Sequence, residues 1–374
     1  MNQFAQDQIA EDFDVAIIGA GMAGASLAAE CAPHARVLLV EAEDTPGYHT
    51  TGRSAAFWVE TYGGPGVFPL TIASGRFLKD GGFIAPRGAL NIGTTADREK
   101  VEAFVDAFAD LGARVELQNR AALDSRIDGL RPDWVVGAWE PECADIDVAG
   151  LHQHYLAEAR RSGTVLRVRA RVEQIEREGG GWRIGWPGGE ARAAMLVNAA
   201  GAWADNVAGM AGAAPLGIQP LRRTIVQLRT DPAPDDALPL TLGINEDFYF
   251  KPQGGRLWLS PHDETPDVAG DAAPEELDVA IAIERFRQVV DWNIDAVERR
   301  WAGLRSFAPD RLPVYGFDAA VEGLFWFAGQ GGFGIQTAPA AARLAAQLLL
   351  RLPRDDMTAE IDAGVYSPAR FATL

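Results

Sequence analysis

The sequence predicts an α/β (α+β) fold, in which a Rossmann-type dinucleotide-binding domain is joined to a second domain built on an antiparallel β-sheet. Three observations lead to this prediction. Residues 14–24 have the pattern of an apolar strand, a glycine turn and the start of a helix. Residues 325–337 repeat that order near the other end of the chain. The segments between them alternate helical and strand periodicities.

Hydrophobic periodicity assigns the elements in order along the chain. Strand 13–18, helix 22–31 and strand 36–40 make one βαβ unit, the usual beginning of a parallel sheet. Residues 164–175 and 182–186 are expected to pair as a hairpin around a run of three glycines. Further helices are expected at 96–111, 148–161, 274–292 and 338–350, and further strands at 195–199, 221–228, 248–251 and 257–260.

The α/β segments are interrupted by two β-rich inserts, which predicts a discontinuous domain organisation. The dinucleotide-binding domain is expected to comprise residues 1–58, 141–215 and 301–374. The inserts, residues 59–140 and 216–300, are expected to form the substrate-binding domain.

Composition limits the partners and the compartment. The formal net charge is −18, and so acidic a surface repels phosphate backbones, which makes nucleic acid an unexpected partner. No apolar run is long enough to span a membrane, and the first twelve residues lack the basic and apolar regions of a signal peptide. Cys31 and Cys143 lack metal-ligand spacing, so we expect no metal site and a reducing, cytoplasmic location.

The glycines of the first turn have separate physical roles. Gly19 permits the tight turn, Gly21 lets the backbone approach a pyrophosphate, and Gly24 lets the helix pack closely against the strand. A tight structural turn is the alternative explanation. The strand before the motif and the helix after it favour the dinucleotide site.

Two further features of this βαβ unit suit a dinucleotide. The helix begins at Met22 and Ala23, whose amides face the expected phosphates. Glu41 ends the next strand, where a carboxylate accepts hydrogen bonds from a ribose hydroxyl and disfavours a 2′-phosphate. NADP is therefore not expected.

Six motifs in order resemble those of the FAD-dependent D-amino acid oxidase/glycine oxidase superfamily, and within it most resemble D-arginine dehydrogenase. The resemblance implies an FAD-binding Rossmann-type domain and a substrate domain with an antiparallel sheet. Neither cysteine lies near a flavin motif, so the FAD is expected to be bound non-covalently. The motifs are residues 19–24, 47–56, 144–147, 196–203, 301–307 and 329–337.

The resemblance also implies which further residues lie along the FAD. One group contacts the flavin and its phosphates, one residue lies near the adenine, and a second strand–turn carries the chain past the cofactor. The last glycine turn presents amides to the flavin ring. The first group is Thr51, Gly52, Arg53, Ser54 and Ala55, and the residue near the adenine is Val172. The second strand–turn contributes Ala200, Gly201 and Trp203, and Gly303 also lies along the cofactor. The last glycine turn contributes Gly331, Gly332, Phe333, Gly334, Ile335 and Gln336.

The implied reaction transfers a hydride from the amino acid Cα to flavin N5, which gives an imino acid that hydrolyses. A substrate carboxylate favours arginine, whose fork binds it in a bidentate manner. Arg222 and Arg305 match the arginines of the family, and Tyr249 and Tyr62 match its carboxylate-binding and loop tyrosines. Arg223 should face the other side of the strand from Arg222, so only one of the two can reach the substrate. Gly332 and Gln336 are expected beside the reacting amine.

Two departures from D-arginine dehydrogenase affect the substrate side chain. Phe57 stands where that enzyme has a histidine, and Ala89 stands where it has the glutamate that pairs with the guanidinium. Without that acid a buried cationic side chain would lack its partner, which is costly. Phe57, Trp58 and Ala89 are therefore expected to form an apolar pocket for a neutral, hydrophobic D-amino acid.

Several alternatives remain open from the sequence. Within the superfamily, the chain could oxidise glycine, sarcosine or another secondary amine. Outside it, the alternatives are a NAD-dependent dehydrogenase and a flavin-containing structural or tRNA-modifying protein. The electron acceptor and the oligomeric state are not encoded in a recognisable motif.

Overall fold

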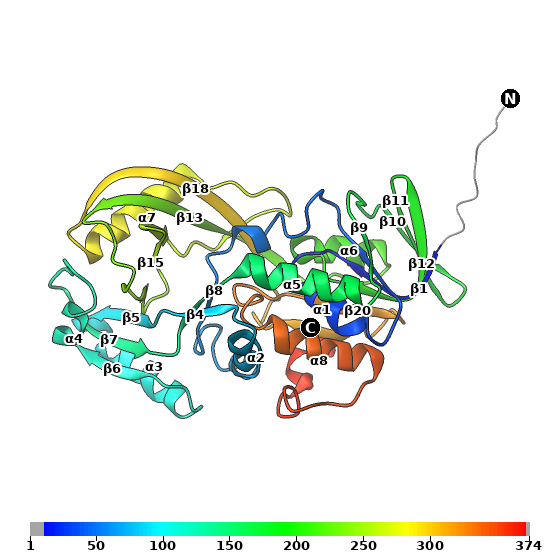
Figure 1. Ribbon diagram of the computed structural model, residues 1–374, viewed down its shortest axis with the longest axis horizontal. Helices are drawn as coiled ribbons and strands as arrows, with labels where there is room; N and C mark the ends of the chain where they lie inside the picture. Colours follow the sequence, from blue (N-terminus) through cyan, green and yellow to red (C-terminus); the bar gives the residue numbers. More distant parts are fainter. Residues whose placement is uncertain (1–10, 372–374) are drawn as a thin grey trace. The chain divides into compact units, whose positions relative to one another are not determined.

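The computed structural model describes residues 11–371, which form two compact units (Figure 1). The chain contributes three segments to the first unit and two to the second. The first unit contains the described residues up to Gly52, then Ala149–Gln219 and the described residues from Ser306. The second unit consists of Arg53–Val148 and Pro220–Arg305.

The first unit is built on an eight-stranded sheet with a parallel centre. β1 (Glu11–Ile18) lies between β12 (Gly189–Asn198) and β2 (Val37–Val40), parallel to both. The side chains of Val37–Val40 are all buried, as expected for a strand covered on both faces. The remaining strands are β9 (Val165–Arg167), β10 (Gln174–Glu178), β11 (Gly181–Trp186), β19 (Val314–Phe317) and β20 (Leu324–Ala328).

Helices of the first unit carry many small residues, which allows close packing. α1 (Met22–Cys31) packs on α8 (Ala338–Leu350), and the two begin and end where the periodicity predicts. Pro339 lies in the first turn of α8, where its missing N–H costs nothing. The unit also contains α5 (Val148–Arg161) and α6 (Ala204–Met210).

The predicted hairpin arm 164–175 is wrong as a single strand. Its first part is β9, which runs parallel to β2 at the edge of the sheet. Arg169 then adopts a left-handed backbone conformation, with φ of 54°, and breaks the extended run. Only β10 pairs with β11 as the antiparallel hairpin.

The second unit is built on a nine-stranded sheet, mixed in direction and largely antiparallel. Its long strands β13 (Gln219–Asp231) and β18 (Asn293–Phe307) pair with each other. The other strands are β5 (Ala89–Thr94), β6 (Glu116–Asn119), β7 (Trp134–Glu140), β14 (Leu240–Gly243), β15 (Tyr249–Gln253), β16 (Arg256–Ser260) and β17 (Thr265–Pro266). A small sheet contains β3 (Phe57–Trp58), β4 (Ile84–Pro86) and β8 (Ala144–Ile146).

One face of the large sheet is covered by α7 (Glu276–Val289), which lies along β13 and β18 in Figure 1. Phe286 of this helix packs on Val226 and Leu259 of the sheet in a continuous apolar core. The other helices of the unit are α2 (Phe68–Asp80), α3 (Arg98–Ala109) and α4 (Arg120–Asp124). These two units, with their mixed and antiparallel sheets, confirm the predicted fold class.

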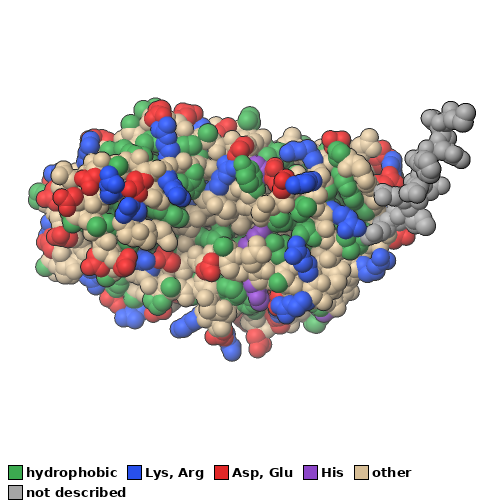
Figure 2. All heavy atoms as spheres, turned by 45° about the horizontal axis from the view of Figure 1, so that its top comes forward, with side chains coloured by type: hydrophobic (Ala, Val, Ile, Leu, Met, Phe, Trp, Pro, Cys, Tyr) green, Lys and Arg blue, Asp and Glu red, His purple; other side chains and the backbone are tan. Residues whose placement is uncertain are grey.

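Acidic and basic side chains are mixed on the molecular surface. On the face drawn in Figure 2, Lys and Arg side chains lie among Asp and Glu side chains, and no continuous basic patch forms there. Within residues 11–371, no helix is both long enough and apolar enough to cross a membrane.

Candidate active site

The first glycine turn, between β1 and α1, brings three backbone segments into close contact. Gly19 has φ of +99°, and a Cβ there would lie 2.5 Å from the carbonyl oxygen of Ala199. A Cβ on Gly24 would lie 1.8 Å from the carbonyl oxygen of Gly19. Only glycine permits this approach, so the turn and the helix start are fixed by backbone packing.

Glu41 is held at the end of β2 with its carboxylate beside the glycine turn. The amide of Ala20 donates to Oε2 at 2.9 Å, and the amide of Glu43 donates to Oε1 at 2.9 Å. The amide of Ala170 donates to the Glu41 carbonyl at 2.8 Å, two residues before the half-buried Val172. The carboxylate predicted to bind the ribose is thus oriented by the backbone on both sides.

The loop after β2 supports the start of α1. Thr51 accepts the amide hydrogen bond of Met22 on Oγ1 at 2.9 Å, and Gly52 donates to the carbonyl of Gly47 at 2.8 Å. Ala23 follows Met22 in the first turn of α1. These predicted cofactor residues therefore converge at the helix N-terminus.

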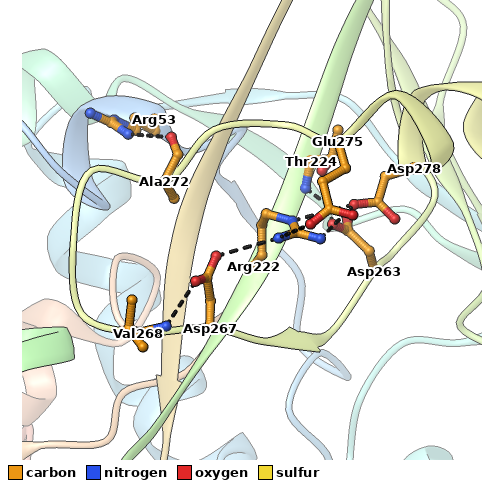
Figure 3. Close-up of polar contacts among 9 residues, drawn as sticks. All are labelled: Arg53, Arg222, Thr224, Asp263, Asp267, Val268, Ala272, Glu275 and Asp278. Carbon is orange, nitrogen blue, oxygen red and sulfur yellow. Dashed lines mark hydrogen bonds and ion pairs between the residues drawn. The ribbon is translucent and has the colours of Figure 1, made fainter.

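Four predicted cofactor residues belong to the second unit: Arg53, Ser54, Ala55 and Gly303. Arg53 donates to the carbonyl of Ala272 at 2.9 Å and forms an ion pair with Asp271. Its guanidinium therefore holds the segment before α7 (Figure 3).

The second strand–turn follows β12. Gly201 has φ of +55°, and Ala200 and Trp203 flank it in a short 3-10 turn. The half-buried Trp203 ring lies 4.8 Å from the His49 ring, centroid to centroid. The chain turns here beside the loop that carries Thr51.

The last glycine turn connects β20 to α8. Gly331 has φ of +54°, and a Cβ there would lie 2.3 Å from the Phe307 ring. A side chain at this position would displace that ring, so the glycine is required by both backbone conformation and packing.

The same turn exposes a row of backbone donors. The amides of Gly332, Gly334 and Ile335 donate to no acceptor among the residues that the structure describes. Phe333, between Gly332 and Gly334, and Gln336, after Ile335, are buried. Such a row of amides can bind an anion or a carbonyl oxygen that becomes negatively charged.

In the second unit, strand register decides which side chains share a face. Lys251 pairs with Trp258, and Trp258 pairs with Gln227, so these three lie on one face of the sheet. Tyr249 and Arg223 lie an even number of residues away on the same strands, and therefore on the same face. This is the face opposite α7, and we call it the site face.

Arg222 lies on the α7 face, where three carboxylates surround it (Figure 3). Its guanidinium contacts Asp278 at 3.1 Å, Glu275 at 2.8 Å and Asp267 at 3.4 Å. The structure therefore does not place Arg222 with Arg305 and Tyr249. Its charge is already balanced within the unit.

Arg223, which the sequence analysis passed over, lies with the predicted carboxylate ligands. Burial and the neighbouring Arg305 guanidinium lower the pKa of Arg223, and Tyr62 and Tyr249 act in the opposite direction. Arg223 Nη1, Arg305 Nε and the Tyr249 hydroxyl are buried without a hydrogen-bond partner among the described residues. Sequence reasoning could favour Arg223 over Arg222 only if the pairing of the strands were known, because strand alternation then places Arg223 on the same face as Tyr249.

Aromatic side chains line the same cluster. The Phe57 ring lies 5.6 Å from the Tyr62 ring and 5.8 Å from the Tyr249 ring. Ala89 is fully buried in this cluster. Trp58 faces away, since its indole donates to the carbonyl of Thr71 in α2 at 3.0 Å.

A buried acid next to this cluster was also missed. Glu140 is 3% exposed and accepts hydrogen bonds from Thr61 and Asn91. It pairs directly with Ala89 across β5 and β7, so the two side chains share a face. The only indication of a buried acid in the sequence is the position of Glu140 at the end of the apolar run 134–140.

The described residues contain neither a cluster of metal ligands nor an activated thiol. Among residues 11–371, no three His, Cys, Asp or Glu side chains are grouped closely enough to hold a metal ion. Cys31 and Cys143 are buried free thiols, and burial raises the pKa of both. Raised pKa values keep them protonated and unreactive.

Comparison with known proteins identifies the family. The model of the family DAO, described as FAD dependent oxidoreductase, matches residues 14–348. Hydrogen cyanide synthase subunit HcnC of Pseudomonas aeruginosa is 28% identical over 280 residues, which cover 74% of this chain and 64% of HcnC. Glycine oxidase of Geobacillus kaustophilus is 24% identical over 358 residues, 91% of this chain and 93% of that enzyme. The chain spans less than two thirds of HcnC, and 34% and 36% of the next two relatives in similarity.

Solved structures share the fold. Glycine oxidase from Geobacillus kaustophilus superposes with a TM-score of 0.84 at 22% identity, over 96% of this chain and 99% of that one. L-α-glycerophosphate oxidase from Mycoplasma pneumoniae, a structure with FAD bound, gives 0.83 at 16% identity, over 95% and 98%.

The first unit fits a bound FAD. The close backbone approach at Gly19 suits a pyrophosphate, Glu41 is oriented for a ribose, and the row of amides after Gly331 suits a flavin carbonyl. With the family match over residues 14–348, these features lead to one conclusion. The chain belongs to the DAO family of FAD-dependent oxidoreductases, and FAD is its cofactor.

Proposed function

We propose that the protein oxidises free D-amino acids with neutral, mainly apolar side chains to imino acids, which then hydrolyse to keto acids and ammonia. The observation that carries this proposal is the arginine pair of the site face. Arg223 Nη1 and Arg305 Nε are buried donors without a partner among the described residues. Buried charged donors are costly unless an anion binds them, and the carboxylate of an amino acid supplies one.

Each residue near the pair has a role in this proposal. Arg305 and Arg223 bind the carboxylate, and Arg223 replaces Arg222, which is neutralised by three acids. The Tyr249 hydroxyl, also without a partner in the described chain, donates to the same carboxylate. Tyr62 lies near enough to both arginines to interact electrostatically with them.

When bound, FAD would accept the hydride from the substrate Cα. The Gly332 carbonyl and the buried Gln336 side chain are proposed to bind the substrate amine. Fixing both the carboxylate and the amine orients Cα, which is the main contribution of the protein to such a reaction. A neutral amine suffices for hydride loss, so no separate base is required.

The substrate side chain is proposed to meet an apolar surface. Phe57 and Ala89 are both buried in the cluster around Tyr249. Trp58 is not proposed to touch the substrate, because its indole is bonded to α2. The D configuration rests on the resemblance of the motif series to D-arginine dehydrogenase.

A second candidate is the oxidation of glycine or an N-methylated glycine. The observation that favours it is the similarity to glycine oxidase of Geobacillus kaustophilus over 93% of that enzyme. Such a substrate has the same carboxylate and would use the same arginine pair.

We also infer that the protein acts in the cytoplasm on small molecules and has no nucleic-acid partner. Two buried free cysteines suit a reducing compartment. The mixed charges in Figure 2 give no basic surface on that face for a phosphate backbone.

The decisive experiment is anaerobic bleaching of the bound flavin by D-, L- and N-methyl amino acids. D-Leu, D-Met and D-Phe should reduce it with higher kcat/KM than D-Arg and D-Lys. Faster reduction by D-Arg or D-Lys would refute the apolar pocket, and reduction by glycine or sarcosine alone would favour the second candidate. Hydrogen peroxide formation, compared with turnover of an artificial electron acceptor, then separates oxidase from dehydrogenase.

A further inference from the structure

Glu140 connects three separate segments of the second unit through one carboxylate oxygen. Thr61 Oγ1 donates to Glu140 Oε1 at 3.0 Å, and Asn91 Nδ2 donates to the same oxygen at 2.8 Å. All three side chains are buried, with exposures of 3% for Glu140, 7% for Thr61 and 8% for Asn91. Hydrogen bonds shielded from water in this way fix the positions of their partners.

The segment that Glu140 holds also carries Tyr62. Thr61 directly precedes Tyr62, whose amide donates to the carbonyl of Val59 at 3.2 Å. Gly63 and Gly64 follow with φ of +98° and +75°. The Gly64 amide donates to the carbonyl of Thr61 at 3.1 Å, but neither glycine has a side chain that could hold the segment. The bond from Thr61 to Glu140 is therefore the nearest side-chain restraint on the N-terminal side of Tyr62.

The sheet side of this connection is rigid. Asn91 lies in β5 and Glu140 at the end of β7, and the two strands pair along their length. β5 also pairs with β14, which pairs with β15, where Tyr249 lies. We call the hydrogen bond between Thr61 and Glu140 the anchor. It connects the segment that carries Tyr62 to the sheet that holds the proposed carboxylate ligands.

We propose that Glu140 is a positioning residue, which through Thr61 holds Tyr62 in place beside the arginine pair for substrate binding. The inference rests on the proposed function, because it takes the arginine pair beside Tyr62 to bind the substrate carboxylate. Glu140 lies opposite Ala89 in the strand pairing, so the alternative role is that of a counter-ion for a cationic substrate side chain. Both bonds to Oε1 show the carboxylate engaged with the protein, which favours the positioning role.

The bonding pattern provides matched variants. Glu140→Gln keeps an amide oxygen that can accept both bonds, whereas Glu140→Leu removes the acceptor at similar volume. Thr61→Ser keeps the hydroxyl, and Thr61→Val removes it at nearly the same shape. Thr61→Val leaves the buried acid in place, so it tests the anchor even where Glu140→Leu fails to fold.

Steady-state kinetics should separate the variants. Loss of one buried hydrogen bond corresponds to about fivefold, so Thr61→Val should raise the KM for the best D-amino acid about fivefold. Glu140→Leu removes both bonds and should raise the KM at least as much, while kcat changes less than about twofold in either variant. Glu140→Gln and Thr61→Ser should restore the wild-type KM. A wild-type KM in Thr61→Val, or a loss of D-Lys turnover alone in Glu140→Gln, would overturn the proposal.

A second measurement does not depend on the substrate. Hydrogen exchange of the amides in residues 59–67 should be faster in Thr61→Val than in Thr61→Ser and wild type, while exchange in β5 and β7 stays unchanged. Equal exchange in the two Thr61 variants would refute the anchor. If no amino acid bleaches the flavin, the proposed function fails, and this measurement still decides whether the anchor exists.

Discussion

Arg222 and Arg223 are adjacent in the chain and nearly equally buried, yet their surroundings are opposite. Arg222 is matched by Asp278, Glu275 and Asp267 on the α7 face. Arg223 has one acidic partner, Glu264 at 3.1 Å, and a second cation, Arg305, nearby. Burial and then Arg305 lower the pKa of Arg223, and its Nη1 has no partner in the described chain. A buried pair of arginines that keeps donors without a partner in the described chain is typical of an anion site.

Replacing each arginine should therefore have a different consequence. Arg223→Met should lower kcat/KM for a D-amino acid by about 100-fold, because a charge-assisted pair with the carboxylate is lost. Arg222→Met should leave kcat/KM within about threefold but lower the free energy of unfolding by about 3 kcal/mol, since Asp278 loses its partner. Kinetics and urea unfolding of both variants measure this, and equal losses of kcat/KM would contradict the assignment.

The ionisation of Glu140 predicts a pH-dependent stability. Burial, with a smaller contribution from Glu60, raises the pKa of Glu140 from 4.5 to about 7, against the hydrogen bonds from Thr61 and Asn91. The folded state therefore holds a proton that the unfolded state has lost, and this stabilisation is complete below 4.5 and disappears as pH rises to about 7.

Glu140→Gln cannot ionise, so its stability should not fall in this interval. The difference in unfolding free energy between variant and wild type should shift in favour of the variant by about 3 kcal/mol between the two limits. Urea unfolding at about pH 4.5 and about pH 8 tests this. An unchanged difference would show that the carboxyl titrates normally.

Among the elements, the β1–turn–α1 segment has the least room for a side chain. Gly24→Ala would place a Cβ 1.8 Å from the carbonyl oxygen of Gly19, which forces α1 away from the turn that binds the pyrophosphate. We expect the purified variant to contain little FAD. Gly209→Ala in α6 is the matched control, because no atom lies within 4 Å of its Cβ position. Flavin absorbance per polypeptide measures both, and full occupancy in Gly24→Ala would refute the tight-turn argument.

The elements show which structure is encoded locally. α1 and α8 were predictable because small and apolar residues repeat with helical period over their full length. β9 was not, because its partner β2 is distant in sequence and a left-handed residue at Arg169 ends it. Periodicity identifies an extended segment but not the strand beside which it lies.

The same limit applies to the candidate site. The glycine turns could be predicted because the chemistry of each lies within a few residues. Alternation showed that Arg222 and Arg223 face opposite sides, but the choice between them depends on the register of β13 with β16 and β15. Glu140 was missed because its partners, Thr61 and Asn91, are far away in sequence.

For the chain as a whole, the two units have separate apolar cores, and the predicted FAD ligands lie mainly in the first. Removing FAD should therefore lower the unfolding temperature of the first unit more than that of the second, because ligand binding stabilises the state that binds it. Calorimetry of the apoprotein, with FAD or riboflavin added back, tests this. Riboflavin lacks the pyrophosphate and adenosine, so it should restore less; equal recovery would contradict the assigned nucleotide site.

The division of the chain has a consequence for its synthesis on the ribosome. The polypeptide passes between the units after Gly52, Val148, Gln219 and Arg305. β20, which pairs with β12, and the amide row after Gly331 are thus translated after both segments of the second unit. The parallel sheet of the first unit therefore stays incomplete until the second unit has been translated, and the flavin can be captured fully only after that.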